Sequence, residues 1–387
     1  MLQARMNMQG TYHSARKNLD IEVLRAIAVL MVLVDHIDFL VFWNGSIAGK
    51  VHAVTSLWGG VDLFFCISGF VITQLFLREV RGGPFMEFAL PFWVRRIYRI
   101  WPSAIFNVLL VLAASLLFNR SGAYGDPKGN FFDAVSVVMQ VANFHWYDCS
   151  ISRGGYCGVN TVYWSLSLEE QFYLVFPFLF FFLSRSALKT VLLAIIGFLF
   201  FTARQPQTFL WETRIDALAW GALIAITHAS ACERKLQPRF LTSKVRAVFT
   251  TVLLSGLIAS LGTNMVVLFQ TGLIALLSAG LVWIASFNEQ YTFPAGKLRN
   301  FLVWTGSRSY ALYLVHPFAA RATREIFFRW YPGQAFDDHF LLRFLLVGAS
   351  LTFAMAEANY RLLETPLRRR GIRLAREFKE YLKVNPA

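Results

Sequence analysis

The sequence predicts an all-α, polytopic membrane protein with about ten transmembrane helices and both termini in the cytoplasm. Of its 387 residues, 56% are hydrophobic and only 16% are charged, which leaves too little polar surface for a soluble protein of this length. The mean hydropathy is +0.49. The basic residues lie between the apolar runs, so the net charge of +14 indicates membrane orientation and not nucleic-acid binding.

Ten apolar runs are each long enough to cross a bilayer, which needs roughly 17 to 25 residues. They cover about 21–43, 57–78, 101–118, 162–183, 187–203, 213–230, 247–263, 265–287, 301–320 and 340–361. An even number of spans places both termini on one side, and most Lys and Arg residues then lie at the cytoplasmic surface. The chain is therefore predicted to have three parts: a cytoplasmic tail (1–20), a transmembrane domain (21–362) and a basic cytoplasmic tail (363–387).

The longest predicted outer loop, 119–161, contains two cysteines in a polar, glycine-rich turn. Cys149 and Cys157 fall in DCSISRGGYC, where a disulfide closes easily if the loop faces an oxidising compartment. Two free thiols are the alternative. No Cys or His spacing along the chain predicts a metal site.

The first predicted span carries two residues that are costly in lipid. Arg25 and His36 are eleven residues apart, so they share a helix face and stand ~16 Å apart along the axis. Arg25 can be explained as an anchor at the inner rim. His36 lies in the outer half, where an ionisable residue is a functional candidate, and its ordinary pKa near neutrality suits proton transfer.

The second and third spans add further candidates. In GGVDLFFCISGF, Asp62 lies near the outer end and Ser68 near the middle, although close helix packing explains the small residues around them. In FWVRRIYRIWP, Arg96 and Arg99 are one helical turn apart on the cytoplasmic side. They fit either a clamp for a multiply phosphorylated ligand or a contact with anionic lipid.

Three later spans also place polar residues in the outer half of the protein. Glu169 in WSLSLEEQFYLVFP is predicted at a depth similar to His36, where a carboxylate can orient an imidazole. Arg214 and Asp216 are two residues apart at the start of the sixth span, which favours an ion pair at the rim. His316 lies in SYALYLVHPF, again below the outer surface.

Taken together, these stretches resemble the acyltransferase-3 family of integral-membrane O-acyltransferases, which decorate bacterial surface glycans and related acceptors. The pieces, in order, are the Arg25-to-His36 spacing, GGVDLFFCISGF, RRIYR, WSLSLEEQFYLVFP, RIDALAWG, SYALYLVHP and ETPLR, and they span Leu19 to Arg369. The resemblance implies that His36 is the catalytic histidine, supported by Arg25, and that Arg96 and Arg99 contact the acyl-CoA donor. It implies that Glu169 and Asp216 are further functional positions.

We therefore expect a transmembrane O-acyltransferase of the bacterial inner membrane. It would move an acyl group, by preference acetyl, from cytoplasmic acyl-CoA to a hydroxyl of an extracytoplasmic glycan or glycolipid, without a metal. We expect His36, Glu169 and Asp62 to be catalytic, and Arg25, Arg96 and Arg99 to bind the donor, while Arg214, Asp216, His316 and Ser68 bind substrate or stabilise the structure. The alternative is a proton-coupled transporter or flippase, because buried His, Asp and Glu residues also form proton relays.

Overall fold

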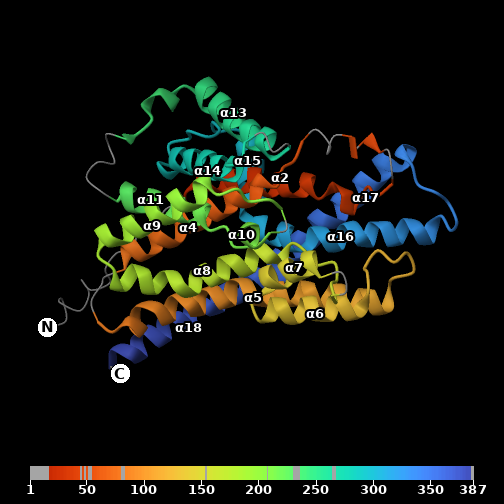
Figure 1. Cartoon of the computed structure of the whole chain (residues 1–387), viewed down its shortest axis with the longest axis horizontal. Coiled ribbons are helices and arrows are strands. Elements are labelled where there is room, and N and C mark those ends of the chain that lie inside the picture. The colour runs from red at the N-terminus through yellow and green to blue at the C-terminus, as the bar shows by residue number, and fades with distance from the viewer. Residues whose placement is uncertain are drawn as a thin grey trace, which may run out of the picture.

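The structure is a computed structural model. It describes residues 17–384 except 44–45, 48, 51–54, 80–82, 153–154, 207, 230–235 and 264–266, so most of the predicted N-terminal tail lies outside the described residues. The described residues form helices joined by turns and irregular connections, and Figure 1 shows the long helices stacked side by side. The helices are α2 (Leu19–Asp35), η1 (Ile37–Phe39), α4 (Gly59–Arg78), α5 (Phe85–Leu117), α6 (Pro127–Val138), α7 (Ala142–Ile151), α8 (Tyr163–Phe182), α9 (Arg185–Phe201), α10 (Phe209–Glu212), α11 (Asp216–His228), η2 (Arg239–Thr242), α13 (Lys244–Thr263), α14 (Gln270–Ser286), α15 (Lys297–Ser307), α16 (Ser309–Trp330), η3 (Asp338–Phe340), α17 (Leu341–Asn359), η4 (Tyr360–Glu364) and α18 (Thr365–Val384).

All ten predicted spans fall on helices. Four helical segments in the described residues are long and apolar enough to cross a membrane by themselves: Gly59–Arg78, Phe85–Leu117, Lys244–Thr263 and Asp338–Leu382. The other predicted spans fall on helices that are shorter or carry more polar residues, such as α8 with its two glutamates. A chain with several such helices is a membrane protein. The count of ten and the cytoplasmic position of both termini stay predictions.

The first span is shorter than predicted. The helix α2 begins after Asn18, whose side chain accepts a hydrogen bond from the backbone N–H of Ile21, and it ends at Asp35 instead of continuing to residue 43. It ends there because the Asp35 carboxylate turns to accept the backbone N–H of Leu57 at 2.6 Å, which ties the end of α2 to the start of α4. His36 is therefore the residue that caps α2, and η1 follows it.

Two other boundaries differ from the sequence prediction. The helix α5 begins at Phe85, directly after Pro84, so the arginine segment predicted as a cytoplasmic connection is the first half of a 33-residue helix. Pro102 lies inside this helix without ending it, because neighbouring helices in a membrane bundle can satisfy the backbone groups that a proline leaves free. The ninth predicted span is two helices, α15 and α16, that meet at Arg308, whose guanidinium turns aside to Glu357.

The polar segments outside the spans are also ordered as helices. The predicted outer loop 119–161 contains α6 and α7. The C-terminal tail is α18, which continues from α17 through η4, so the predicted boundary at 362 falls inside a continuous helical run. Figure 1 shows α18 lying along one half of α5 and α6 along the other. Gly371 permits this approach, because a Cβ there would lie 2.5 Å from the Cβ of Tyr98.

The helix α4 forms the centre of the bundle, where it packs against α2, α11 and α14. Two glycines bring α4 and α11 into backbone contact: a Cβ at Gly69 would lie 2.0 Å from the carbonyl oxygen of Leu218, and one at Gly221 would lie 2.0 Å from that of Cys66. Small residues at helix contacts are typical of membrane bundles, which the sequence predicted for Gly69. This close packing holds α4 in place, and α4 forms one wall of the candidate site described below.

Candidate active site

A cavity with an empty volume of about 750 Å³ lies between α2, α4, α5, α8 and α16. Its lining follows α4 from Val61 to Ile72, a separation of eleven positions that corresponds to ~16 Å along the helix axis. Arg25, Arg96 and Arg99 all line it, so the structure brings together the three arginines that the sequence predicts as a donor site. The cavity is therefore elongated, and it presents three cationic groups to whatever enters.

The three arginines differ in whether a carboxylate pairs with them. Arg25 donates to Glu22 at 2.9 Å, a partner that the sequence analysis did not identify. The guanidinium of Arg96 stacks over two aromatic rings, 5.5 Å from the centroid of Phe92 and 5.2 Å from that of Tyr173. For Arg96 and Arg99 the described chain provides no ion pair. A cavity with this balance favours an anionic ligand.

A chain of hydrogen bonds crosses the cavity wall from α4 to α8. Ser68 Oγ is bonded to the phenol of Tyr173, and the Tyr173 hydroxyl donates to Glu169 Oε2 at 2.9 Å. Ser68 and Glu169 therefore belong to the arginine-lined cavity. The prediction that Glu169 orients His36, which rested on depth alone, is wrong about this contact, because the carboxylate is turned toward Tyr173 and the arginines.

The structure brings His316 next to His36. The two imidazoles are stacked with centroids 5.2 Å apart, and His36 Nδ1 lies 3.2 Å from His316 Nε2. The other nitrogen of His316, Nδ1, lies 2.8 Å from the backbone carbonyl oxygen of Tyr313. His316 is buried and His36 is half-buried, so the pair is held at the edge of the packed core.

The histidine pair and the cavity share one wall. Tyr313 lines the cavity with its side chain while its carbonyl holds His316, and its hydroxyl bonds to Ser165 and to the carbonyl oxygen of Val162. The cavity and the histidine pair also lie at similar heights in the bundle. A Cβ on Gly60 would lie 2.9 Å from Met31, so the neighbouring Val61 lies beside the last turns of α2. The end of the cavity at Val61 is therefore within a few turns of His36.

Aromatic packing fixes the outer side of the histidine pair. Phe39 of η1 stacks on His36 with centroids 4.8 Å apart and an interplanar angle of 12°. The guanidinium of Arg321 lies 4.6 Å from the Phe39 centroid, and it donates to the carbonyl oxygens of Pro317 and Val159. The early end of α2 therefore places His36 in a stack instead of in a lipid-facing turn.

Asp62 is engaged elsewhere. Both of its carboxylate oxygens accept hydrogen bonds of 3.2 Å from the guanidinium of Arg214. That guanidinium is also enclosed by indole rings, with centroid distances of 5.4 Å to Trp58, 4.5 Å to Trp164 and 3.9 Å to Trp211. Both charged side chains are fully buried, so this pair joins α4 to the start of α11 inside the bundle.

The predicted rim pair between Arg214 and Asp216 is wrong. Asp216 instead accepts two hydrogen bonds of 2.7 Å from Arg204, in a bidentate pair that is also fully buried. The physical reason is direction: at the start of a helix, residues two positions apart point to different faces, so each finds a different partner. Arg204 was missed because it lies in an irregular connection that gives no helical spacing to measure.

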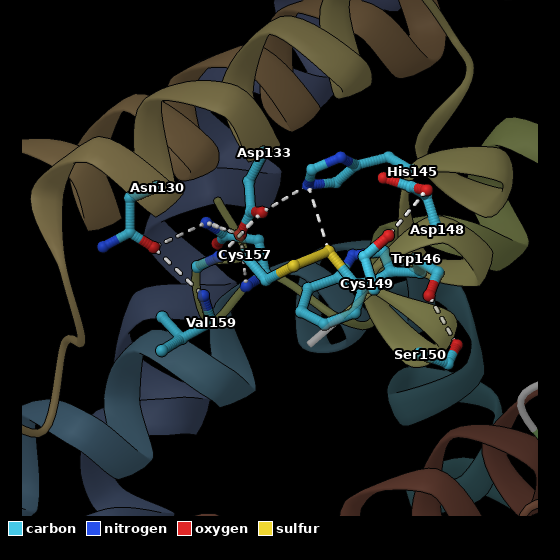
Figure 2. Close-up of a disulfide and its surroundings, with 12 residues drawn as sticks. Asn130, Asp133, His145, Trp146, Asp148, Cys149, Ser150, Cys157 and Val159 are labelled. Carbon is cyan, nitrogen blue, oxygen red and sulfur yellow. Dashed lines mark hydrogen bonds and ion pairs between the residues drawn. A yellow bond between two sulfur atoms is a disulfide. The ribbon is translucent and has the colours of Figure 1, made fainter. Parts of the chain in front are cut away.

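The segment 119–161, which was predicted as an outer loop, contains the disulfide between Cys149 and Cys157, whose Cα atoms are 5.9 Å apart. Figure 2 shows how it is anchored: His145 lies between the disulfide and Asp133, with Nε2 at 3.0 Å from Asp133 Oδ1 and 3.8 Å from Cys149 Sγ. Asp133 also accepts the backbone N–H groups of Gly158 and Asn160. Asp133 therefore fastens both sides of the disulfide-closed turn to α6.

Several residues of the site were missed in the sequence. Tyr173 could have been found, because it lies four residues after Glu169 on one helix, the spacing at which side chains meet. No sequence spacing predicted Tyr313, because its contact with His316 uses a backbone carbonyl and depends on the rotation of α16 about its axis. Glu22 lies three residues before Arg25 and was detectable by the same rule as Tyr173.

Comparison with known proteins gives a consistent relationship. The peptidoglycan O-acetyltransferase OatA of Listeria monocytogenes is 27% identical over 387 residues, which cover 94% of this chain and 58% of that protein. The O-acetyltransferase OatA of Staphylococcus aureus is 26% identical over 374 residues, covering 90% of this chain and 57% of the relative. The chain thus spans a little under three fifths of the length of these relatives. No solved structure matches it significantly.

The family model for the acyltransferase domain of the acyltransferase-3 type matches residues 18–356. This match includes the cavity, the histidine pair and the disulfide, and it leaves out residues 1–17, the end of α17, η4 and α18. The chain belongs to the acyltransferase-3 family.

Proposed function

We propose that the chain is a membrane O-acetyltransferase that uses cytoplasmic acetyl-CoA to acetylate a hydroxyl of an extracytoplasmic glycan or glycolipid in the bacterial inner membrane. The observation that carries the proposal is the arginine-lined cavity whose wall, at Tyr313, also holds the histidine pair. The names of the relatives support the reaction, and the name of the Listeria protein supports a carbohydrate polymer as acceptor.

The cavity suits a long donor with an anionic head. Arg25, Arg96 and Arg99 would bind the phosphates of the donor, because guanidinium groups form charge-assisted bonds to phosphate oxygens. The lining of ~16 Å along α4 leaves room for the thin arm that carries the thioester. Donor entry from the cytoplasm follows from the predicted topology, which places the arginine half of α5 on that side.

His36 would act as the general base. It takes the proton of the acceptor hydroxyl as the oxygen attacks the thioester carbonyl, so that a C–O bond forms and an anionic tetrahedral intermediate results. Collapse of that intermediate breaks the C–S bond, and the leaving thiolate takes the proton back from His36. The products are the acetyl ester and free CoA thiol, and the histidine returns to its starting state.

The structure changes the roles that we propose for three other residues. Asp62 is proposed as a structural residue, because Arg214 occupies both of its oxygens. Asp216 is proposed as structural for the same reason, through Arg204. Glu169 is proposed to position Tyr173 and Ser68 in the donor cavity.

The test is turnover of labelled acetyl-CoA by the purified protein in detergent or nanodiscs. Wild-type protein should release CoA thiol slowly to water and faster when peptidoglycan fragments are added as acceptors, with label on the fragments. His36→Gln should lose at least about 10²-fold of the rate, as expected when a general base is removed. His339→Gln is the matched control, because His339 is exposed on η3, away from the cavity.

Undiminished turnover in His36→Gln would remove His36 from the chemistry. If no thioester is consumed with any fragment or with water, while a glycan or lipid precursor crosses a proteoliposome membrane, the chain is a transporter and the enzyme proposal fails.

A further inference from the structure

His316 makes two hydrogen bonds that together determine where its proton lies. Its Nδ1 is 2.8 Å from the carbonyl oxygen of Tyr313, and a carbonyl oxygen can only accept, so Nδ1 carries the proton. A neutral imidazole has one N–H, and Nε2 of His316 therefore carries the lone pair. A second proton on this ring would bury a full positive charge whose ring nitrogens face only a carbonyl and another imidazole, which is costly.

The proton on His36 follows from that assignment. His36 Nδ1 lies 3.2 Å from the lone pair on His316 Nε2, so the bond exists only if His36 Nδ1 is the donor. A neutral His36 with its proton on Nδ1 has its lone pair on Nε2. The nitrogen that can accept a proton from a substrate is thereby fixed as Nε2, which is the ring position opposite the His316 contact.

We propose that His316 is a positioning residue, which holds His36 in the tautomer whose Nε2 is the base and orients its ring through the stack of His316, His36 and Phe39. The catalytic consequence rests on the proposed function, whereas the tautomer does not. The arrangement is that of a base oriented by a third group, with an uncharged imidazole in the place where many hydrolases have a carboxylate.

The same bond serves during the reaction. When Nε2 of His36 receives the proton of the acceptor hydroxyl, the ring becomes an imidazolium whose Nδ1–H still points to His316. That hydrogen bond is then charge-assisted and roughly twice as strong, so His316 stabilises the protonated base at the moment when charge develops. His316 itself neither releases nor accepts a proton, and its Nδ1–H keeps its hydrogen bond to the Tyr313 carbonyl oxygen.

Two substitutions of His316 distinguish this positioning role from a role in packing alone. His316→Phe keeps an aromatic ring of similar shape in the stack but has neither nitrogen, so its kcat should fall about 10²-fold while its KM for acetyl-CoA stays within about twofold. His316→Gln offers a side-chain oxygen near the place of Nε2, so it should recover kcat to within about tenfold of wild type. His339→Gln again controls for loss of a histidine at an exposed site.

The second readout needs no substrate. In protein labelled with ¹⁵N-histidine, magnetic resonance distinguishes protonated from unprotonated ring nitrogens, and the His36 signals are assigned by their loss in His36→Gln. Wild-type protein should show His36 protonated on Nδ1 alone, and His316→Phe should give a mixture of the two tautomers.

Each outcome decides the proposal. A wild-type His36 protonated on Nε2, or a His316→Phe protein with unchanged kcat and unchanged tautomer, overturns it. If His316→Phe does not fold, the wild-type tautomer and the rate of His316→Gln remain as the test. Should wild-type protein consume no thioester while His36 still shows the expected tautomer, the proposed function fails and the assignment of the pair stands.

Discussion

Asp62 and Arg214 face each other with two parallel hydrogen bonds of 3.2 Å, although they are 152 residues apart in the sequence. Asp62→Ala should lower the free energy of unfolding by about 3–5 kcal/mol, because it leaves a buried guanidinium without its counter-charge. Chemical or thermal unfolding in detergent micelles measures this loss.

The double variant Asp62→Leu with Arg214→Met removes both charges and should recover most of that stability, as buried pairs replaced by apolar residues often do. An Asp62→Ala protein as stable as wild type but without acetyl-CoA turnover would contradict the structural role and restore the catalytic one.

Arg96 and Arg99 should contribute to donor binding and not to the chemical step. Changing either to Gln should raise KM for acetyl-CoA about 10- to 100-fold with kcat nearly unchanged, since a hydrogen bond to a charged group contributes about 1.5–3 kcal/mol. Steady-state release of CoA thiol measures both constants. Arg95→Gln is the matched control, because Arg95 pairs with Glu79 and does not line the cavity.

The same variants can be tested with a shorter donor. S-acetylpantetheine has the thioester but no phosphates, so Arg96→Gln and Arg99→Gln should use it as well as wild type does. A defect of equal size with both donors would show that these arginines do not read the phosphates.

Gly221 should tolerate no side chain. In Gly221→Ala the new Cβ would meet the carbonyl oxygen of Cys66 at 2.0 Å, so α4 and α11 must separate, at a cost of about 1–3 kcal/mol or more. Gly197→Ala is the control: no atom lies within 4 Å of its Cβ, and the protein should be unchanged or more stable by up to about 1 kcal/mol. The yield of monodisperse protein and its melting temperature compare the two.

The disulfide should stabilise the outer segment locally. Cys149→Ser should destabilise it by about 2–3 kcal/mol, the value expected for a loop of this length. Limited proteolysis between α6 and α8 measures that change. Cys157→Ser and the double variant should behave the same way, because each of the three variants loses the same disulfide. A larger, additive effect in the double variant would contradict this account.

Apolar length predicted where helices occur but not where they end. All ten runs fall on helices because hydrophobicity acts over a whole turn, whereas the end of α2 depends on one bond from Asp35 to the backbone of Leu57. The start of α5 was misplaced because its arginines suggested an exposed connection. Arg96 and Arg99 instead line the cavity, and α18 packs along the same helix. The sequence alone does not reveal these contacts.

Some members of the candidate site were predicted from the sequence, but their pairings were not. Spacing alone placed His36 and His316 in the outer half, and the structure brings them to 3.2 Å. Which residue faces which depends on the rotation of each helix about its axis. Depth alone could not identify Arg214 as the partner of Asp62 or Arg204 as the partner of Asp216.

The partner of His36 is uncharged, and this matters in a medium of low polarity. A carboxylate in place of His316 would put a permanent negative charge beside the point where an oxyanion has to form, and it would need a counter-ion even when no substrate is bound. In the proposed arrangement the two imidazoles are neutral when no substrate is bound, and the guanidinium of Arg321 lies nearby, against Phe39. If His36 is the base, opposite charges would arise together, one on its imidazole and one on the substrate, and both would disappear when the thiol departs.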